Sequence, residues 1–139
     1  MQQIEKVAVV VAAGMGAGEA ANVAACVAAG LSAAAPGWAG AALEDVDGLR
    51  SAASSHLPIA VLMADEARMK ALVQALAGER PAGAAVVLFP AYAQRIQDAA
   101  SYWAEHRGCS HRSARMLAVG MAGSRRWINR LAGSLPLLR

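Results

Sequence analysis

Four apolar runs recur along the chain, separated by polar or glycine-rich segments. An unbroken apolar run of this kind is typical of a strand that is covered on both faces of a sheet. We therefore expect four buried strands, at residues 6–12, 58–64, 84–89 and 115–123.

The segments between these runs carry helix signals. Asp65 and Ser124 are good N-cap residues, and Pro36-Gly37 and Gly78 are stop signals. Alternating strands and helices indicate one α/β domain over the whole chain, with a mostly parallel sheet covered on both sides. The predicted helices span residues 18–34, 65–77, 91–107 and 125–132, with an irregular segment at 37–57, a turn at 45–48 and an extended tail from 134.

Composition narrows the function classes. The 139 residues are 57% hydrophobic, much of it alanine, and only 4% aromatic, which disfavours a base-stacking nucleic-acid surface. Cys26 and Cys109 are far apart and imply no disulfide framework, so we expect a cytoplasmic protein. The uncharged span 20–43 is long enough to cross a membrane, but Asn22, Pro36 and several glycines argue against a membrane helix.

Charge is distributed unevenly along the chain. Residues 106–139 contain seven arginines and no acid, and residues 1–105 carry a balance of −4. Such asymmetry can mark a surface for an anion or a nucleic acid. Alternatively the acidic part packs against the basic part or against a second subunit, which is the interpretation that we favour.

The turn after the first strand contains Gly14, Gly16 and Gly18. Gly16-x-Gly18-x-x-Ala21 has the form of a dinucleotide fingerprint. However, no acid closes a following strand at the required spacing, and Glu19 would repel a pyrophosphate. Nucleotide binding is therefore disfavoured, and we expect no cofactor.

Two polar residues of the first helix are candidate ligand contacts. Glu19 and Asn22 are three residues apart, so they share one helix face. The helix dipole alone accounts for a glutamate in a first turn. A buried amide, by contrast, requires hydrogen-bond partners, which makes Asn22 the more informative residue.

Two further clusters carry candidate chemistry. The stretch HRGCSH (106–111) has two histidines and a cysteine, but its spacing matches no standard zinc site, so we expect a solvated loop and no metal. The last helix begins at Ser124, where backbone N–H groups beside Arg125 and Arg126 could bind an anion. The alternative is two arginines on a solvated face, and we slightly favour it.

The stretches VAVVVAAGMGAGEAANVAACVAAGL, LPIAVLMADEARM and INRLAGSLPLLR resemble an uncharacterised bacterial family, domain of unknown function 2000, of the peptidyl-tRNA hydrolase type II superfamily. The resemblance covers nearly the whole chain. It implies a three-layer α/β/α fold with a four-stranded mixed sheet, in which the last strand, near Met116 to Met121, is antiparallel to the others. It also implies a homodimer.

The hydrolase residues do not carry over. The hydrolases open their first helix with lysines, where this chain has Glu19 and Ala21, and follow their third strand with an aspartate and a threonine, where it has Pro90 and Gln94. Within the nearer family, a polar stretch such as REDL follows the first strand, where this chain has AAGM. Hydrolysis of peptidyl-tRNA by the usual residues is therefore not expected.

Our leading hypothesis is a non-hydrolase homologue that binds a small polar or peptide-like ligand, or a protein partner, in the ancestral cleft. The alternative is a hydrolase that acts on peptidyl-tRNA or another acyl compound through other residues, with the basic C-terminal third holding RNA. A third hypothesis is a structural dimer module. The candidate ligand-binding residues are Gly14, Gly18, Glu19, Asn22, Tyr92, Gln94, Arg125 and Arg126.

Overall fold

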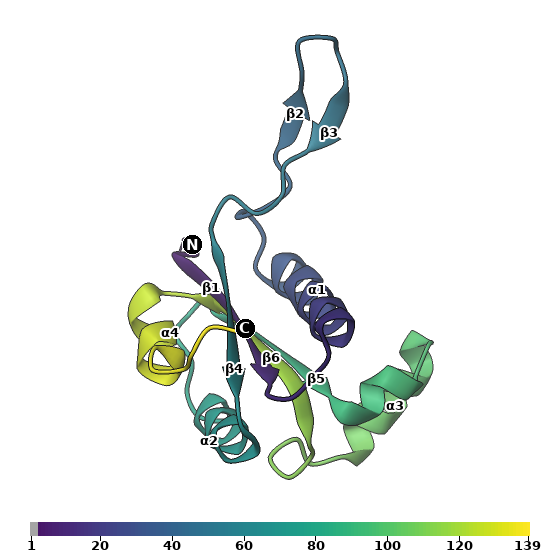
Figure 1. Ribbon diagram of the computed structural model, residues 1–139, viewed down its shortest axis with the longest axis vertical. Helices are drawn as coiled ribbons and strands as arrows, with labels where there is room; N and C mark the ends of the chain where they lie inside the picture. The colour runs from purple at the N-terminus through teal and green to yellow at the C-terminus, as the bar shows by residue number, and fades with distance from the viewer. Residues whose placement is uncertain (1–2) are drawn as a thin grey trace.

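The computed structural model describes residues 3–139, which form a four-stranded sheet between two layers of helices (Figure 1). A small two-stranded hairpin extends away from this body. The strands are β1 (Lys6–Ala12), β2 (Ala42–Glu44), β3 (Arg50–Ala52), β4 (Ile59–Ala64), β5 (Ala85–Pro90) and β6 (Met116–Gly123). The helices are α1 (Ala17–Ala34), α2 (Glu66–Leu76), the 3₁₀ helix η1 (Ala91–Arg95), α3 (Ala99–Gly108) and α4 (Arg125–Ala132).

The main sheet has the order β4-β1-β6-β5. β1 runs parallel to β4, and β6 runs antiparallel to both of its neighbours, β1 and β5. This arrangement confirms the α/β class and the mixed sheet with an antiparallel last strand. The four strands lie within a few residues of the four apolar runs that predicted them.

The alternation of side chains along β1 divides the core into two clusters. Val7, Val9 and Val11 pack against α1, whereas Ala8 and Val10 face α2 and α4. All five side chains are buried, as expected for a strand in the middle of a sheet between helices. Figure 1 shows α1 on one side of the sheet and α2 with α4 on the other.

A glycine in β6 sets how closely α1 approaches the sheet. A Cβ atom at Gly120 would overlap the Val27 side chain and lie 2.8 Å from Leu31 Cδ1. Both of these α1 side chains are fully buried, so neither has room to move aside. The close packing of α1 on the sheet therefore requires a residue without a side chain at position 120.

The length and composition of α1 would also suit a membrane span. Its mean hydropathy is 1.2, and 22% of the helix is buried against the rest of the chain. The buried residues include Ala20, Val23, Val27 and Leu31, which form the stripe facing the sheet. The core helix of an α/β/α sandwich can be as long and as apolar as a membrane span. The expected absence of a membrane helix therefore stays a prediction.

The segment after β5 differs from the single helix predicted over 91–107. η1 ends at Arg95, Ile96 is extended, and α3 begins after Asp98. The Asp98 carboxylate accepts a hydrogen bond from the backbone N–H of Ser101 at 2.7 Å, so it caps a new helix instead of continuing an old one. The prediction overlooked this N-cap.

The segment predicted as irregular over 37–57 contains the hairpin of β2 and β3. The predicted turn at 45–48 is confirmed, because Gly48 N–H donates to the Asp45 carbonyl and Gly48 has a φ of 84°. The Asp45 side chain also accepts from the N–H groups of Asp47 and Leu49. Every residue of β2 and β3 is exposed, so the hairpin lacks the apolar pattern of a packed strand.

The C-terminal tail is extended, as predicted, and it lies along the outer edge of β4. Met63 N–H donates to the Pro136 carbonyl, and Leu138 N–H donates to the Val61 carbonyl, both at 2.9 Å. These bonds satisfy backbone groups of β4 that face away from β1. The tail therefore covers one of the two edges of the sheet.

We predict that Gly120→Val lowers the free energy of unfolding by about 1–3 kcal/mol or more, because the added side chain overpacks the contact with α1. Denaturant unfolding followed by circular dichroism measures the change. The matched control is Gly18→Ala, where a Cβ meets nothing within 4 Å and stability should hold or rise. Equal stability of Gly120→Val and the wild type would contradict this account of the packing.

Candidate functional site at the carboxyl ends of β1 and β4

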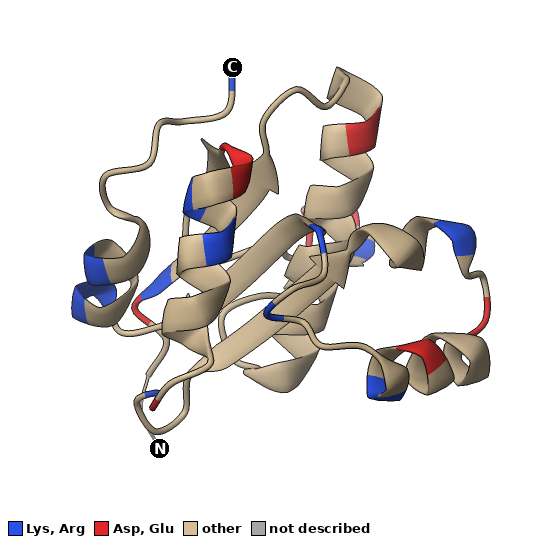
Figure 2. Cartoon of the chain, turned by 90° about the horizontal axis from the view of Figure 1, so that it is seen from below, with Lys and Arg blue, Asp and Glu red and all other residues tan. Residues whose placement is uncertain are grey.

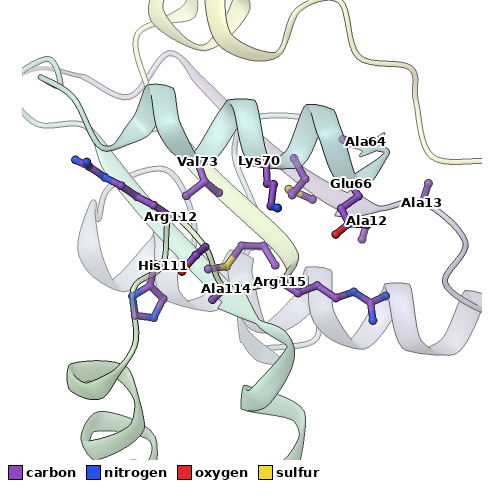
Figure 3. A pocket seen from close by; sticks show the side chains of 13 residues that line it. Ala12, Ala13, Ala64, Glu66, Lys70, Val73, His111, Arg112, Ala114 and Arg115 are labelled. Atoms are coloured by element: carbon purple, nitrogen blue, oxygen red, sulfur yellow. The ribbon is translucent and has the colours of Figure 1, made fainter.

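A cavity of about 460 Å³ lies beside the ends of β1 and β4 (Figure 3). Its walls come from α2 on one side and from the loop that leads into β6 on the other. Ala12, Ala13 and Ala64 line it where the two parallel strands end, and their small side chains leave the space unfilled. Further lining residues are Glu66, Met69, Lys70, Val73, His111, Arg112, Ser113, Ala114, Arg115 and Met116.

The chain path explains why the cavity forms at this place. After β1 the chain passes to α1 on one face of the sheet, and after β4 it passes to α2 on the other face. Helices that diverge to opposite faces leave a crevice beyond the carboxyl ends of neighbouring parallel strands. Because β6 is antiparallel, its first residues and the preceding loop close the crevice from the far side.

Positive charge predominates around the cavity. Lys70, Arg112 and Arg115 line it with one carboxylate, Glu66. Within residues 3–139, the sole ion pair is Glu44 with Arg50 in the hairpin, so these three cations are not neutralised by direct contact. Figure 2 shows basic residues (blue) both on α2 and on the loop before β6. The crevice therefore favours an anionic ligand.

His111 connects the cavity to a cluster of aromatic and imidazole rings. The Tyr92 hydroxyl lies 2.8 Å from His111 Nε2 and 3.4 Å from His106 Nδ1. The two imidazole rings stack with centroids 3.8 Å apart, and Tyr102 lies 6.0 Å from the His106 ring. One hydroxyl can donate to one ring and accept from the other, so Tyr92 holds both histidines in place.

The surroundings of Tyr92 and His111 favour the neutral forms of these two side chains. Burial, with smaller contributions from the charges of Tyr102, Cys109 and Glu105, raises the pKa of Tyr92 to about 12. Burial, and secondly the nearby His106, lowers the pKa of His111 below its usual value. Near neutral pH the cluster thus offers the cavity an uncharged imidazole held by an uncharged phenol.

The described residues hold no group of three or more His, Cys, Asp or Glu side chains that could bind a metal ion. In the HRGCSH stretch, the Cys109 sulfur lies 3.9 Å from Glu105 Oε1, and the two histidines contact Tyr92 instead. The Ser113 hydroxyl, which lies in the cavity wall, donates to the Ser110 carbonyl.

Several predicted site residues lie near this end of the sheet but on the side of α1. Gln94 Nε2 donates to Glu19 Oε1 at 3.0 Å, which joins the first helix to the segment after β5. Gly14 has a φ of 88°, as a tight turn after β1 requires, and Gly18 lies in the first turn of α1. Asn22 is exposed, so burial does not require partners for its amide, contrary to the argument from sequence.

Arg125 and Arg126 lie at the opposite end of the sheet from Glu19. β6 ends where Gly123 pairs with Lys6, the first residue of β1, roughly 20 Å along the strand from Ala12. The backbone N–H of Arg125 donates to the carboxylate of Glu5 at 2.9 Å. The candidate ligand-binding residues Arg125 and Arg126 therefore do not share a cleft with Glu19 and Gln94, and a carboxylate of the chain itself lies where an anion could have bound.

Sequence reasoning missed the residues that line the cavity. Glu66 and Lys70 have the i, i+4 spacing that places two side chains on one face of a helix, directly after a buried strand. Arg112 and Arg115 precede the last strand. The start of an antiparallel strand lies beside the carboxyl ends of its neighbours. The antiparallel last strand that the resemblance implied would therefore have placed Arg112 and Arg115 at this end of the sheet.

The fold and the crevice define an α/β protein with a cationic cavity at the ends of two parallel strands. The sequence matches the family described as "Protein of unknown function (DUF2000)" over residues 5–139, and the chain belongs to this family, as the resemblance had indicated. No curated protein matches the chain.

A solved structure, that of the protein of unknown function Atu0240 from Agrobacterium tumefaciens strain C58, is similar to this chain. The TM-score is 0.83 at 18% sequence identity, over 96% of this chain and 97% of the other. At this identity the similarity shows a shared fold.

The lowered pKa of His111 leads to a prediction on stability. Between its native pKa and the ordinary value of 6.5, the unfolded chain binds more protons at this residue than the native state does. Acidification through this window therefore reduces the free energy of unfolding through His111. In His111→Gln, the loss of stability from about pH 7.5 to about pH 5.5 should be smaller than in the wild type. Urea unfolding at both pH values measures it, and identical losses would contradict the prediction.

Proposed function

We propose that this protein binds a small anionic molecule, such as a carboxylate or a phosphate ester, in the cavity between α2 and the loop before β6. The observation that carries the proposal is the excess of cations over carboxylates around a cavity of about 460 Å³. This volume lies in the range of small-molecule sites. The polar ligand expected from the sequence is thus an anion in this proposal. Its contacts are Lys70, Arg112 and Arg115 instead of the residues beside α1.

The crevice supports this assignment by its position as well as by its charge. Ligands of open α/β sheets bind beyond the carboxyl ends of strands whose helices diverge. Met69, Val73 and Met116 supply apolar wall, and the basic side chains stand at both sides. This combination suits a ligand with an apolar portion and a charged end.

The binding test compares cavity variants with a surface control. A panel of small carboxylates and phosphate esters is screened by thermal shift, and hits are titrated by calorimetry. Lys70→Ala and Arg115→Ala should each weaken binding by about 10–100-fold, the loss of one charged hydrogen bond. Arg130→Ala, which removes an exposed cation of α4, should leave affinity unchanged.

The same titrations distinguish the two sides of the sheet. If Glu19→Ala or Asn22→Ala reduces affinity while Lys70→Ala does not, the ligand binds beside α1 and the proposed cavity is wrong. If no compound of the panel shifts the melting temperature of the wild type, the small-anion proposal fails.

A second candidate function follows from three residues of the same cavity. Lys70, Glu66 and Ser113 offer a cation, a carboxylate and a hydroxyl, the types of group that are missing from the expected hydrolase positions. This set favours a hydrolase of peptidyl-tRNA or another acyl compound through non-standard residues. The hydrogen bond of Ser113 to a backbone carbonyl does not activate it as a nucleophile, so we place this candidate second.

We predict that the purified protein does not hydrolyse labelled peptidyl-tRNA above the spontaneous rate. At the positions where the hydrolases that it resembles carry lysines, an aspartate and a threonine, this chain has other residues. Turnover that Lys70→Ala or Ser113→Ala abolishes would establish the second candidate instead. If the protein binds RNA with an affinity that falls steeply with added salt, the arginines of residues 106–139 would be supported as the RNA-binding surface.

A further inference from the structure

In the described part of the chain, the backbone of one edge strand of the main sheet is hydrogen-bonded on its outer side, and that of the other edge strand is not. β4 forms one edge, and the C-terminal tail bonds to its backbone at Val61 and Met63. β5 forms the other edge and pairs only with β6. Within residues 3–139, no other segment forms a backbone or side-chain hydrogen bond with the backbone of residues 85–89.

An unpaired edge of this kind can accept another strand. In an antiparallel pair, alternate residues direct their N–H and C=O groups toward the neighbour, and the others direct them away. Val86, Val87, Leu88 and Phe89 carry no charge and no proline that would prevent a further strand from pairing. These four side chains are half-buried, whereas the central strand β6 is buried along its whole length.

A groove lies beside this edge on the side of α2. It has a volume of about 280 Å³, and Val86 and Leu88 of β5 form one wall. Val73 and Leu76 of α2, with the C-cap residue Ala77, form the opposite, apolar wall. Val86 and Leu88 pack against the margin of the core cluster that α2 and α4 form with the sheet, and both side chains stay half-buried.

Charge along the groove is positive. Arg80, just before β5, and Arg112, in the loop before β6, line it together with His111 and Ser110. No acidic side chain lines it, and neither arginine forms an ion pair with a described residue. Arg80 Nε donates to the Leu76 carbonyl, which leaves its other guanidinium nitrogens for a ligand.

We propose that β5 binds an extended peptide segment of a partner protein by adding it to the sheet as a fifth strand. Main-chain hydrogen bonds to β5 hold the segment, and alternate apolar side chains enter the groove between Leu88 and Leu76. Acidic residues at the ends of the segment meet Arg80 and Arg112.

The charges select this occupant over a second copy of the chain. Pairing of β5 with β5 of another copy would bring together two edges that each carry Arg80 and Arg112, and like charges oppose such pairing. The inference does not depend on the proposed function. The cavity and the groove share Val73, His111 and Arg112. Lys70 and Arg115 line only the cavity and Arg80 lines only the groove, so Lys70→Ala tests the small anion and Arg80→Glu tests the peptide.

The first part of the test varies the peptide and uses the unaltered protein. The probe is a fluorescein-labelled peptide with a Val-Thr-Val core between two glutamates, and binding is followed by fluorescence anisotropy at low salt. Replacement of both glutamates by lysine should weaken binding at least about tenfold, because the charges then repel. Methylation of the backbone nitrogens should also weaken it at least about tenfold, because the added strand loses its hydrogen bonds.

Two protein variants complete the experiment. Arg80→Glu should reduce affinity for the acidic peptide at least about fivefold. Arg130→Glu, a matched charge reversal on the exposed face of α4, should not. Equal binding of the methylated and unmethylated peptides, or no binding of the acidic peptide, overturns the proposal. A concentration-dependent dimer in sedimentation that excludes the acidic peptide assigns the edge to a second copy and also overturns it.

Discussion

The antiparallel pairing of β6 with β1 in the middle of the sheet determines where the candidate chemistry lies. Val10 pairs with Val119, and this register carries the start of β6 to the carboxyl ends of β1 and β4. Arg112 and Arg115 therefore reach a cavity whose floor consists of strand-end alanines. The same register carries the end of β6, and with it α4, to the opposite end of the sheet. A parallel β6 would exchange these two groups of arginines.

The basic C-terminal third does not form one surface. Arg112 and Arg115 line the cavity, whereas Arg125 begins a helix whose backbone N–H bonds to Glu5. Lys6 Nζ donates to Asn129 at this same end of the sheet, so the two ends of the chain are tied together by polar contacts. The Glu5 carboxylate contacts the backbone N–H of Arg125 and not its guanidinium, and the ion pair found among residues 3–139 lies in the hairpin, so the interpretation that acidic and basic parts pack against each other stays a prediction. At the cavity, cations remain in excess.

The sequence predicted the elements better than their relations. Apolar runs identify strands because burial on both faces leaves an unbroken pattern, and Asp65 and Ser124 cap their helices as expected. No local signal gives the direction of β6, because parallel and antiparallel central strands have the same apolar composition; the resemblance supplied it. The hairpin was missed because its strands are exposed and three residues long. The cavity was missed because it joins residues of α2 to a loop some forty positions later, a proximity that depends on topology.

The late position of β6 in the chain has a consequence for synthesis on the ribosome. β1 emerges early, but the strand that covers its other side begins at Met116, and the tail that closes the β4 edge comes last. Until then the valines of β1 have no complete sheet around them, and loop closure over such a distance delays pairing. The nascent chain therefore keeps the apolar β1 without its full set of neighbours until β6 has been made.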